Sequence, residues 1–225
     1  MIKFAIAFHR KEGMDHDACI THYREKHGPL CVSTPGMTDH CSLYLQNDVA
    51  NDGRDDYPSG VTLAWFDDLD RLFSHFSVPA YMPIIRPDEL SFSRHDNALV
   101  AMGDERVVVS GGGMAQVRVF RFLRAKAESD QVEQFRANEY APRIAQSAES
   151  LGLVGFSRTV SMPVDLPFPP EQVFDGLDEF IFETPDTAQR FLEWEADLAR
   201  KVGADSYFDE AKSATFTTSA TRKVF

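Results

Sequence analysis

Histidine is the residue type in this sequence that points most directly to chemistry. Imidazole has an ordinary pKa that allows proton exchange near neutral pH, so it is the usual acid or base of an enzyme site. All seven histidines lie within the first 95 of 225 residues. This uneven distribution predicts one working site in the N-terminal half and a C-terminal half without one. The seven are His9, His16, His22, His27, His40, His75 and His95.

His27 is the first candidate for proton transfer. Gly28 and Pro29 follow it, and a proline disfavours helical backbone at the residue before it. We therefore expect a helix to end here, with the His27 ring pointing back over a neighbouring sheet as a catalytic group. A histidine at a helix end can equally cap the last carbonyls. The sequence leaves both roles open.

His40 and Tyr44 belong to a polar alternation, His40, Ser42, Tyr44 and Gln46. Residues two apart share one face of a strand. The pattern predicts a pocket wall on which His40 acts as acid or base and Tyr44 donates to a developing oxyanion. The outer face of a solvated edge strand would give the same pattern, so this interpretation also stays open.

Several further side chains are predicted to contact a substrate rather than react with it. A small-molecule site is usually an apolar cleft with a few convergent polar groups. His9 ends a run with small alanines beside it, and Tyr81 stands between two prolines, as expected of a rim. The predicted substrate-binding residues are His9, Tyr23, Trp65, Tyr81 and His95.

Cysteine and histidine spacings do not indicate a metal site. The three cysteines, Cys19, Cys31 and Cys41, form no CxxC pair, and HxxxH and HExxH are absent from the sequence. An odd number of cysteines without such spacing is typical of reduced, mostly buried thiols. We therefore predict neither a metal nor a disulfide.

Two halves with the same order of elements must position these residues. Apolar runs and helical periodicity predict strand, helix, strand, strand, helix and strand in each half, which is the ferredoxin-like unit. The predicted ranges are 2–10, 14–26, 37–46, 61–66, 69–76 and 98–109 in the first half, and 116–123, 130–148, 153–161, 179–183, 187–200 and 214–224 in the second.

A constant spacing between matching residues supports a duplication. The same 116 positions separate Gly36 from Gly152 and Phe66 from Phe182. We predict a site-bearing domain over 1–110 and a degenerate, mainly supporting domain over 114–225, joined at a Ser-Gly-Gly-Gly linker. A ferredoxin-like sheet leaves one apolar face uncovered, so we expect an α+β chain in which two antiparallel sheets pack face to face.

The stretch HYREKHGPL, residues 22–30, resembles the EthD family of the dimeric α+β barrel superfamily, whose members carry an aromatic residue and then His-Gly-Pro at this place. Gly36-Met37 and the run WFDDL, residues 65–69, also fit. The resemblance covers most of residues 1–109. It implies a cleft between sheet and helices. The second half has Glu139-Tyr140-Ala141-Pro142 at the matching place and lacks the histidine.

The resemblance implies a small-molecule enzyme without a cofactor. We expect a lyase, isomerase or dehydratase that acts on an aromatic compound by histidine-mediated proton transfer. Two alternatives are a non-catalytic accessory or ligand-binding protein of aromatic metabolism and a cofactor-free monooxygenase. The fold alone does not choose among them.

Composition excludes other classes of protein. The formal net charge is −12, and no basic footprint for nucleic acid is visible. The first apolar run is too short for a membrane span. We therefore expect a cytoplasmic protein with neither a nucleic-acid nor a membrane partner, and we leave open whether it forms a homodimer.

Overall fold

Eight strands carry the fold in the computed structural model, which describes residues 1–51, 53–54, 57–114, 117–162 and 164–225. They are β1 (Ile2–Arg10), β2 (Leu43–Val49), β3 (Gly60–Phe66), β4 (Ser93–Val109), β5 (Val117–Leu123), β6 (Leu153–Ser161), β7 (Gly176–Phe182) and β8 (Ala214–Lys223). Gln116, predicted to begin a strand, lies outside the described residues.

The described strands form one closed barrel in the order β1-β3-β2-β8-β5-β7-β6-β4, and every neighbouring pair is antiparallel. The predicted fold class, two ferredoxin-like sheets packed face to face, is therefore wrong. The reason is edge pairing. β2 pairs with β8 and β4 pairs with β6, so strands from the two halves share hydrogen bonds and leave no separate sheets.

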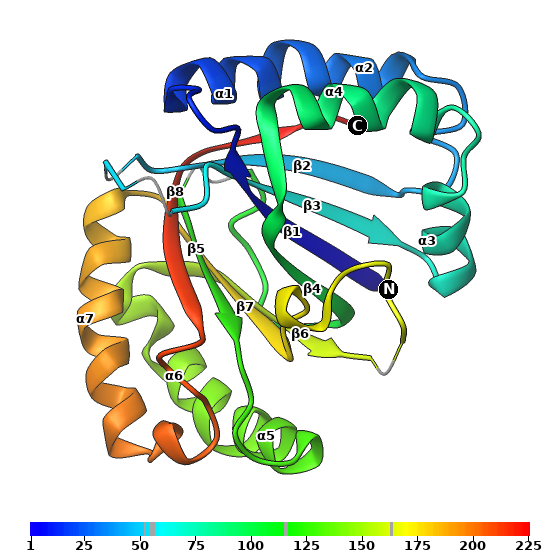
Figure 1. Ribbon diagram of the computed structural model, residues 1–225. Helices are drawn as coiled ribbons and strands as arrows, with labels where there is room; N and C mark the ends of the chain where they lie inside the picture. Colours follow the sequence, from blue (N-terminus) through cyan, green and yellow to red (C-terminus); the bar gives the residue numbers. More distant parts are fainter. Residues whose placement is uncertain (52, 55–56, 115–116, 163) are drawn as a thin grey trace.

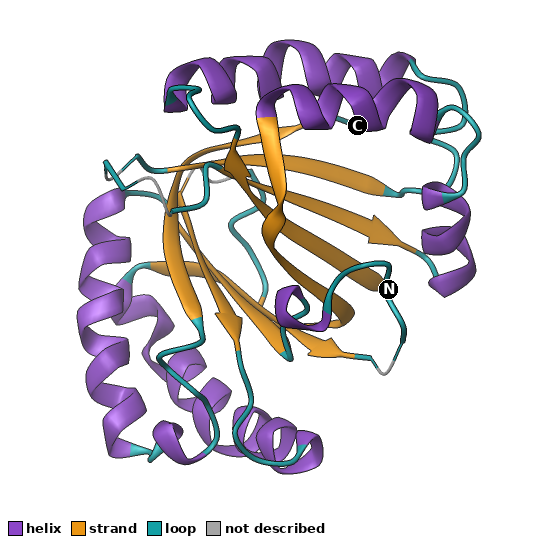
Figure 2. Cartoon of the chain, in the orientation of Figure 1, coloured by secondary structure: helices purple, strands orange, loops and turns teal. Residues whose placement is uncertain are grey.

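Helices cover the outside of the barrel (Figures 1 and 2). On the first half, α1 (His16–His22), η1 (Tyr23–His27) and α2 (Gly28–Ser33) run on as one rod. α3 (Leu69–Phe76), η2 (Tyr81–Ile85) and α4 (Arg86–Phe92) follow β3. On the second half lie α5 (Ser129–Phe135), η3 (Arg136–Tyr140), α6 (Ala141–Leu151) and α7 (Pro185–Lys201). Short 3₁₀ turns are η4 (Pro170–Gln172) and η5 (Ala204–Ser206).

Three π-helical turns each precede a proline. The turns end at His27, Ile85 and Tyr140, and Pro29, Pro87 and Pro142 lie two residues further on. Proline donates no amide hydrogen and its ring crowds the carbonyl one turn earlier. A locally widened turn accommodates it, so the helix continues past the proline. The expectation that the helix ends at His27 is wrong for this reason.

Alternation along β1 sorts its side chains between two environments. Phe4, Ile6 and Phe8 point towards the helices, whereas Lys3 and Ala5 point into the barrel. The barrel interior is filled by an apolar cluster of both halves and by a buried ionic group in which Glu179 contacts Lys3 and Arg118. Space for a ligand therefore lies between the sheet and the helices.

Candidate active site

A cavity of about 110 Å³ lies between the outer face of the first-half strands and the helices η1–α2 and η2–α4. Its walls are mostly aromatic and aliphatic, and its polar side chains come mainly from the two helical segments. An engineered apolar cavity of about 150 Å³ binds benzene, so this space suits a compact, single-ring ligand. The ring-bearing wall residues are Phe4, Phe8, Tyr23, His27, Tyr44, Phe66, His75, Phe76, Tyr81, Phe92, His95, Phe168 and Phe225.

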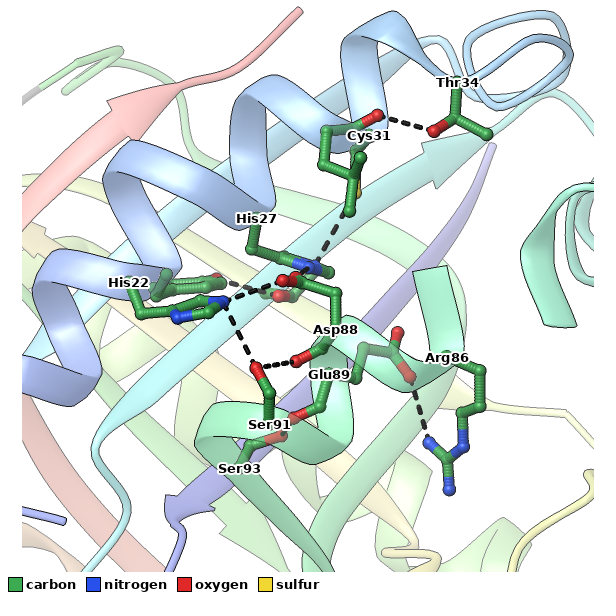
Figure 3. Close-up of polar contacts among 12 residues, drawn as sticks. His22, His27, Cys31, Thr34, Arg86, Asp88, Glu89, Ser91 and Ser93 are labelled. Atoms are coloured by element: carbon green, nitrogen blue, oxygen red, sulfur yellow. Dashed lines mark hydrogen bonds and ion pairs between the residues drawn. The ribbon is translucent and has the colours of Figure 1, made fainter. Parts of the chain in front are cut away.

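His27 stands at the polar end of this cavity. Its side chain is 7% exposed, and its Nδ1 lies 2.9 Å from Asp88 Oδ2. Its Nε2 lies 3.6 Å from the Cys31 sulfur, one helical turn along the same rod (Figure 3). The ring packs against Tyr23 and Phe92, at centroid distances of 6.0 and 5.3 Å. Its nitrogens thus contact side chains, and the helix-capping role does not apply.

Asp88 fixes the tautomer of His27. An ionised carboxylate only accepts hydrogen bonds, so His27 Nδ1 carries a proton and Nε2 is the nitrogen that can exchange one. Asp88 also accepts from His22 Nε2 at 2.7 Å. Burial raises the pKa of Asp88, but the hydrogen bonds from His27 and His22 outweigh it and lower the pKa below its ordinary value.

The same contacts favour the cationic form of His27. Burial lowers the pKa of this ring, but the hydrogen bonds to Asp88 and Cys31 raise it to about 10. Burial lowers the pKa of His75, a second histidine on the cavity wall, to about 4. At neutral pH, His27 is therefore cationic, whereas His75 is neutral.

A second polar chain runs along the η2–α4 wall. Tyr81 donates to Glu89 at 3.0 Å, and Arg86 donates to Glu89 at 3.0 Å and to His95 Nδ1 at 2.9 Å. Burial, then the Arg86 charge, lowers the pKa of His95 to about 4. Burial, then Glu89, raises the pKa of Tyr81. This wall therefore offers a carboxylate paired with a guanidinium, and a neutral hydroxyl.

Tyrosine hydroxyls line the strand side. Tyr23 Oη lies 2.8 Å from Thr62 Oγ1, and burial raises the pKa of Tyr23. Burial, then the neighbouring Tyr23, raises the pKa of Tyr44 well above its ordinary value. Both phenols stay protonated near neutral pH, so they can donate hydrogen bonds to a ligand oxygen.

Gly28 allows the rod to approach the sheet closely. A Cβ at this position would lie 2.6 Å from Arg222 Nη2 and 3.0 Å from Gln46 Oε1. Arg222 donates to Gln46 Oε1 at 2.6 Å and to the carbonyl of Arg24. The glycine of the His-Gly-Pro run therefore sets the depth at which His27 sits above the strands.

The structure brings five of the predicted site residues to one cavity: Tyr23, His27, Tyr44, Tyr81 and His95. Three others lie elsewhere. His40 precedes β2, which begins at Leu43, and contacts Arg71 at 3.4 Å. Trp65 points into the barrel and donates to Glu105 at 2.7 Å. His9 is buried on the β1 face that carries Ala5 and Ala7.

The sequence analysis predicted Tyr81 of η2 but missed Asp88 and Glu89 of α4, the helix that faces His27. It also missed Cys31, although an i, i+4 spacing from His27 places the two side chains on one helix face. Two more wall residues come from the other half, Phe168 in the segment after β6 and Phe225 beyond β8.

The second half uses the matching place differently. Tyr140 corresponds to His27, since both end a π-helical turn two residues before a proline. Its hydroxyl accepts from Arg121 at 3.0 Å and donates to Glu195, and the residue is fully buried. Burial, then Glu195, raises its pKa well above the ordinary value. The Tyr140 hydroxyl is therefore part of a buried polar cluster in the second half.

No helix among the described residues is long and apolar enough to cross a membrane. No group of three or more histidine, cysteine or acidic side chains in the same ranges is arranged to hold a metal ion.

Residues 11–96 match the family model described as EthD domain. The fold is similar to that of an anthrone oxidase-like protein, with a TM-score of 0.67, 9% identity, and coverage of 99% of this chain and 93% of that one. A Fusobacterium nucleatum protein provisionally named a monooxygenase has a TM-score of 0.60 and 12% identity, with coverage of 99% of this chain and 93% of that one. A chlorite dismutase variant from Candidatus Nitrospira defluvii has a TM-score of 0.56 and 10% identity, with coverage of 97% of this chain and 90% of that one. At these identities the likeness shows the fold. No curated protein matches the chain significantly.

Proposed function

We propose that this protein, whose residues 11–96 match the EthD domain model, is a cofactor-independent enzyme that acts on a small aromatic compound by proton transfer at His27. One observation carries the proposal. The histidine whose tautomer Asp88 fixes stands at the polar end of an otherwise apolar, ring-lined cavity.

The role of His27 follows from its charge. The cationic ring can place its Nε2 proton on a substrate oxygen, and so stabilise an enolate or phenolate that develops there. Glu89 lines the same cavity and can accept a proton from the substrate. Tyr44 supplies a second donor for the oxygen. Such a set suits a lyase, isomerase or dehydratase reaction. His40 lies outside the cavity and is not part of this proposal.

We assign the second half a mainly supporting role, with the exception of the rings that it contributes to the cavity. Its own counterpart of His27 is the tyrosine Tyr140, whose hydroxyl is held by Arg121 and Glu195. This assignment keeps one site per chain, in the half that carries the histidines.

The experiment is turnover of a panel of single-ring phenols and enols, followed by absorbance and mass spectrometry. His27→Gln is expected to reduce kcat about 100-fold or more, the range of general acid–base catalysis. His75→Gln is the matched control, because His75 lines the same cavity without a carboxylate partner among its hydrogen bonds. Equal effects of the two substitutions would contradict a special role for His27.

Two other functions have distinct signatures in the same assay. A monooxygenase, as suggested by the provisional name of one structural neighbour, would consume dioxygen in step with the substrate. A ligand carrier would bind members of the panel in calorimetry and convert none of them. Dioxygen uptake and binding are therefore measured alongside turnover.

A further inference from the structure

Cys31 lies where a nucleophile would be placed for this cavity. Its Sγ is 3.6 Å from His27 Nε2, and both side chains belong to the cavity wall. The two residues stand four apart on one rod, so the helix itself holds them in contact. Figure 3 shows the Cys31 side chain directed towards His27.

Asp88 completes an ordered set of three groups. It accepts from His27 Nδ1 on the side of the ring opposite to the sulfur. An activated nucleophile is recognised by this order, in which a third group orients the base and the base contacts the nucleophile. Here all three members are at most one-sixth exposed, with side-chain exposures of 7% for His27 and 16% for Asp88, and 5% for Cys31 as a residue.

We propose that Cys31 is a nucleophile paired with His27, and that it adds to an α,β-unsaturated carbonyl compound held in the cavity. In the reacting pair, the proton of the Cys31 thiol is already held on Nε2 of the cationic His27 ring, and the sulfur is a thiolate. The thiolate then forms a C–S bond with the β-carbon, and the carbon–carbon π electrons move towards the carbonyl to give an enolate. His27 returns the proton to the enolate oxygen, so atoms and charge balance with no other reactant.

The other two cysteines provide a contrast within the same chain. Cys41 also lines the cavity, but its thiol donates to the carbonyl of Leu43 at 3.1 Å, and burial raises its pKa to about 11. Cys19 donates to the carbonyl of Phe92 at 3.4 Å, and burial raises its pKa to about 12. A thiol bonded to a backbone carbonyl gains nothing that would stabilise its thiolate, whereas a neighbouring imidazolium does.

The inference deepens the proposed function and rests on it only for the location of the site. Its test uses the full-length protein without substrate and N-ethylmaleimide as the unsaturated carbonyl probe. Labelling is followed by intact mass and peptide mapping. Cys41 controls for entry of the probe, because it lines the same space. At pH 7, Cys31 is expected to react about ten times faster than Cys41 or more, because reactivity follows thiolate content.

Variants then test the pairing. His27→Gln is expected to slow labelling of Cys31 about tenfold or more and to leave Cys41 unchanged, and Asp88→Asn to act in the same direction more weakly. Equal rates for Cys31 and Cys41, an unchanged rate in His27→Gln, or no labelling of Cys31 would each overturn the proposal.

A wild-type measurement covers the case in which His27→Gln does not fold. An ordinary thiol reacts about ten times faster for each pH unit gained below its pKa, and Cys41 should follow that slope. The Cys31 rate is expected to change less than about threefold between pH 7 and pH 9, and a tenfold slope would overturn the proposal. Selective labelling without turnover of any phenol would count against the proposed function alone.

Discussion

His27 and Tyr140 occupy the same place in the two halves of the barrel. Each ends a π-helical turn, and in each case a proline follows two residues later. Around His27 the helices leave a cavity, whereas around Tyr140 the charged side chains of Arg121 and Glu195 fill the space. One position of the scaffold thus serves a candidate reaction in the first half and packing in the second.

Tyr140→Phe is expected to lower stability and to leave ligand binding unchanged. It removes a buried hydroxyl that bonds Arg121 and Glu195, at a cost of about 1–3 kcal/mol in the free energy of unfolding. Urea denaturation measures this change. Tyr207→Phe, a half-buried tyrosine of the same half, is the control. A variant of full stability would show that the cluster contributes no net stabilisation.

Asp88→Asn is expected to destabilise the protein by about 2 kcal/mol at pH 7, as for loss of a buried hydrogen bond to a charged group. The pKa of His27 is raised to about 10 in the folded state, above the ordinary value of about 6.5. The stabilisation of the folded state by the charged His27 is therefore complete below about pH 6.5, the ordinary pKa of histidine, and is lost as the pH rises through about 10. The pKa of Asp88 is lowered, so the contribution of the carboxylate is also lost in acid.

Denaturant titrations of the Asp88→Asn variant and the wild type at pH 7 and at pH 10.5 measure the effect. The difference between the two proteins should shrink at the higher pH. Asp70→Asn, on the exposed side of α3, controls for a lost surface carboxylate. A difference that stays constant over this range would contradict a charged His27–Asp88 pair.

Ala64→Leu is expected to block the cavity. Ala64 is a buried residue of β3 whose side chain lines the cavity, so a larger side chain would occupy the space of a ring. Binding of single-ring phenols, measured by calorimetry, should weaken about tenfold or more, while far-ultraviolet circular dichroism stays unchanged. Ala64→Ser, which adds little volume, should bind within about threefold of the wild type. Undiminished binding to the leucine variant would place the ligand elsewhere.

Phe168→Ala is expected to weaken ligand binding by about 1–3 kcal/mol, as for loss of a large apolar contact. The Phe168 ring lines the cavity and lies 6.1 Å from the ring of Phe4. Stopped-flow measurement should show that the effect is mainly a faster dissociation. Leu166→Ala changes the same segment without touching the cavity wall. If both substitutions weaken ligand binding equally, the effect depends on the segment as a whole rather than on the Phe168 ring.

Much of the site could be located from the sequence because it depends on local patterns. The His-Gly-Pro run marked His27, and the five tyrosine and histidine residues that meet in the cavity were predicted from short stretches of sequence. His40 was misplaced because the two-residue alternation was extended to residues before β2, which begins at Leu43. Trp65 was misassigned because alternation does not say which strand face meets the helices.

The helix opposite His27 could not be found because Pro79 and Pro83 suggested a rim around Tyr81. In the structure a π-helical turn accommodates Pro87, and the helix that follows carries Asp88 and Glu89. The closure of the barrel also could not be predicted from the sequence. Each half predicts its own strands, but the pairing of β2 with β8 depends on edges that lie far apart in sequence.

The rings of Phe168 and Phe225 reach the cavity from the second half, and this constrains how the chain could be recombined. A chimera that took residues 1–110 from this protein and the remainder from a relative would combine the candidate site residues of this protein with wall residues of the relative. Ligand preference would then follow neither parent. Selection for a new ligand must act on both halves of the gene together, even where only one of them carries the candidate reacting groups.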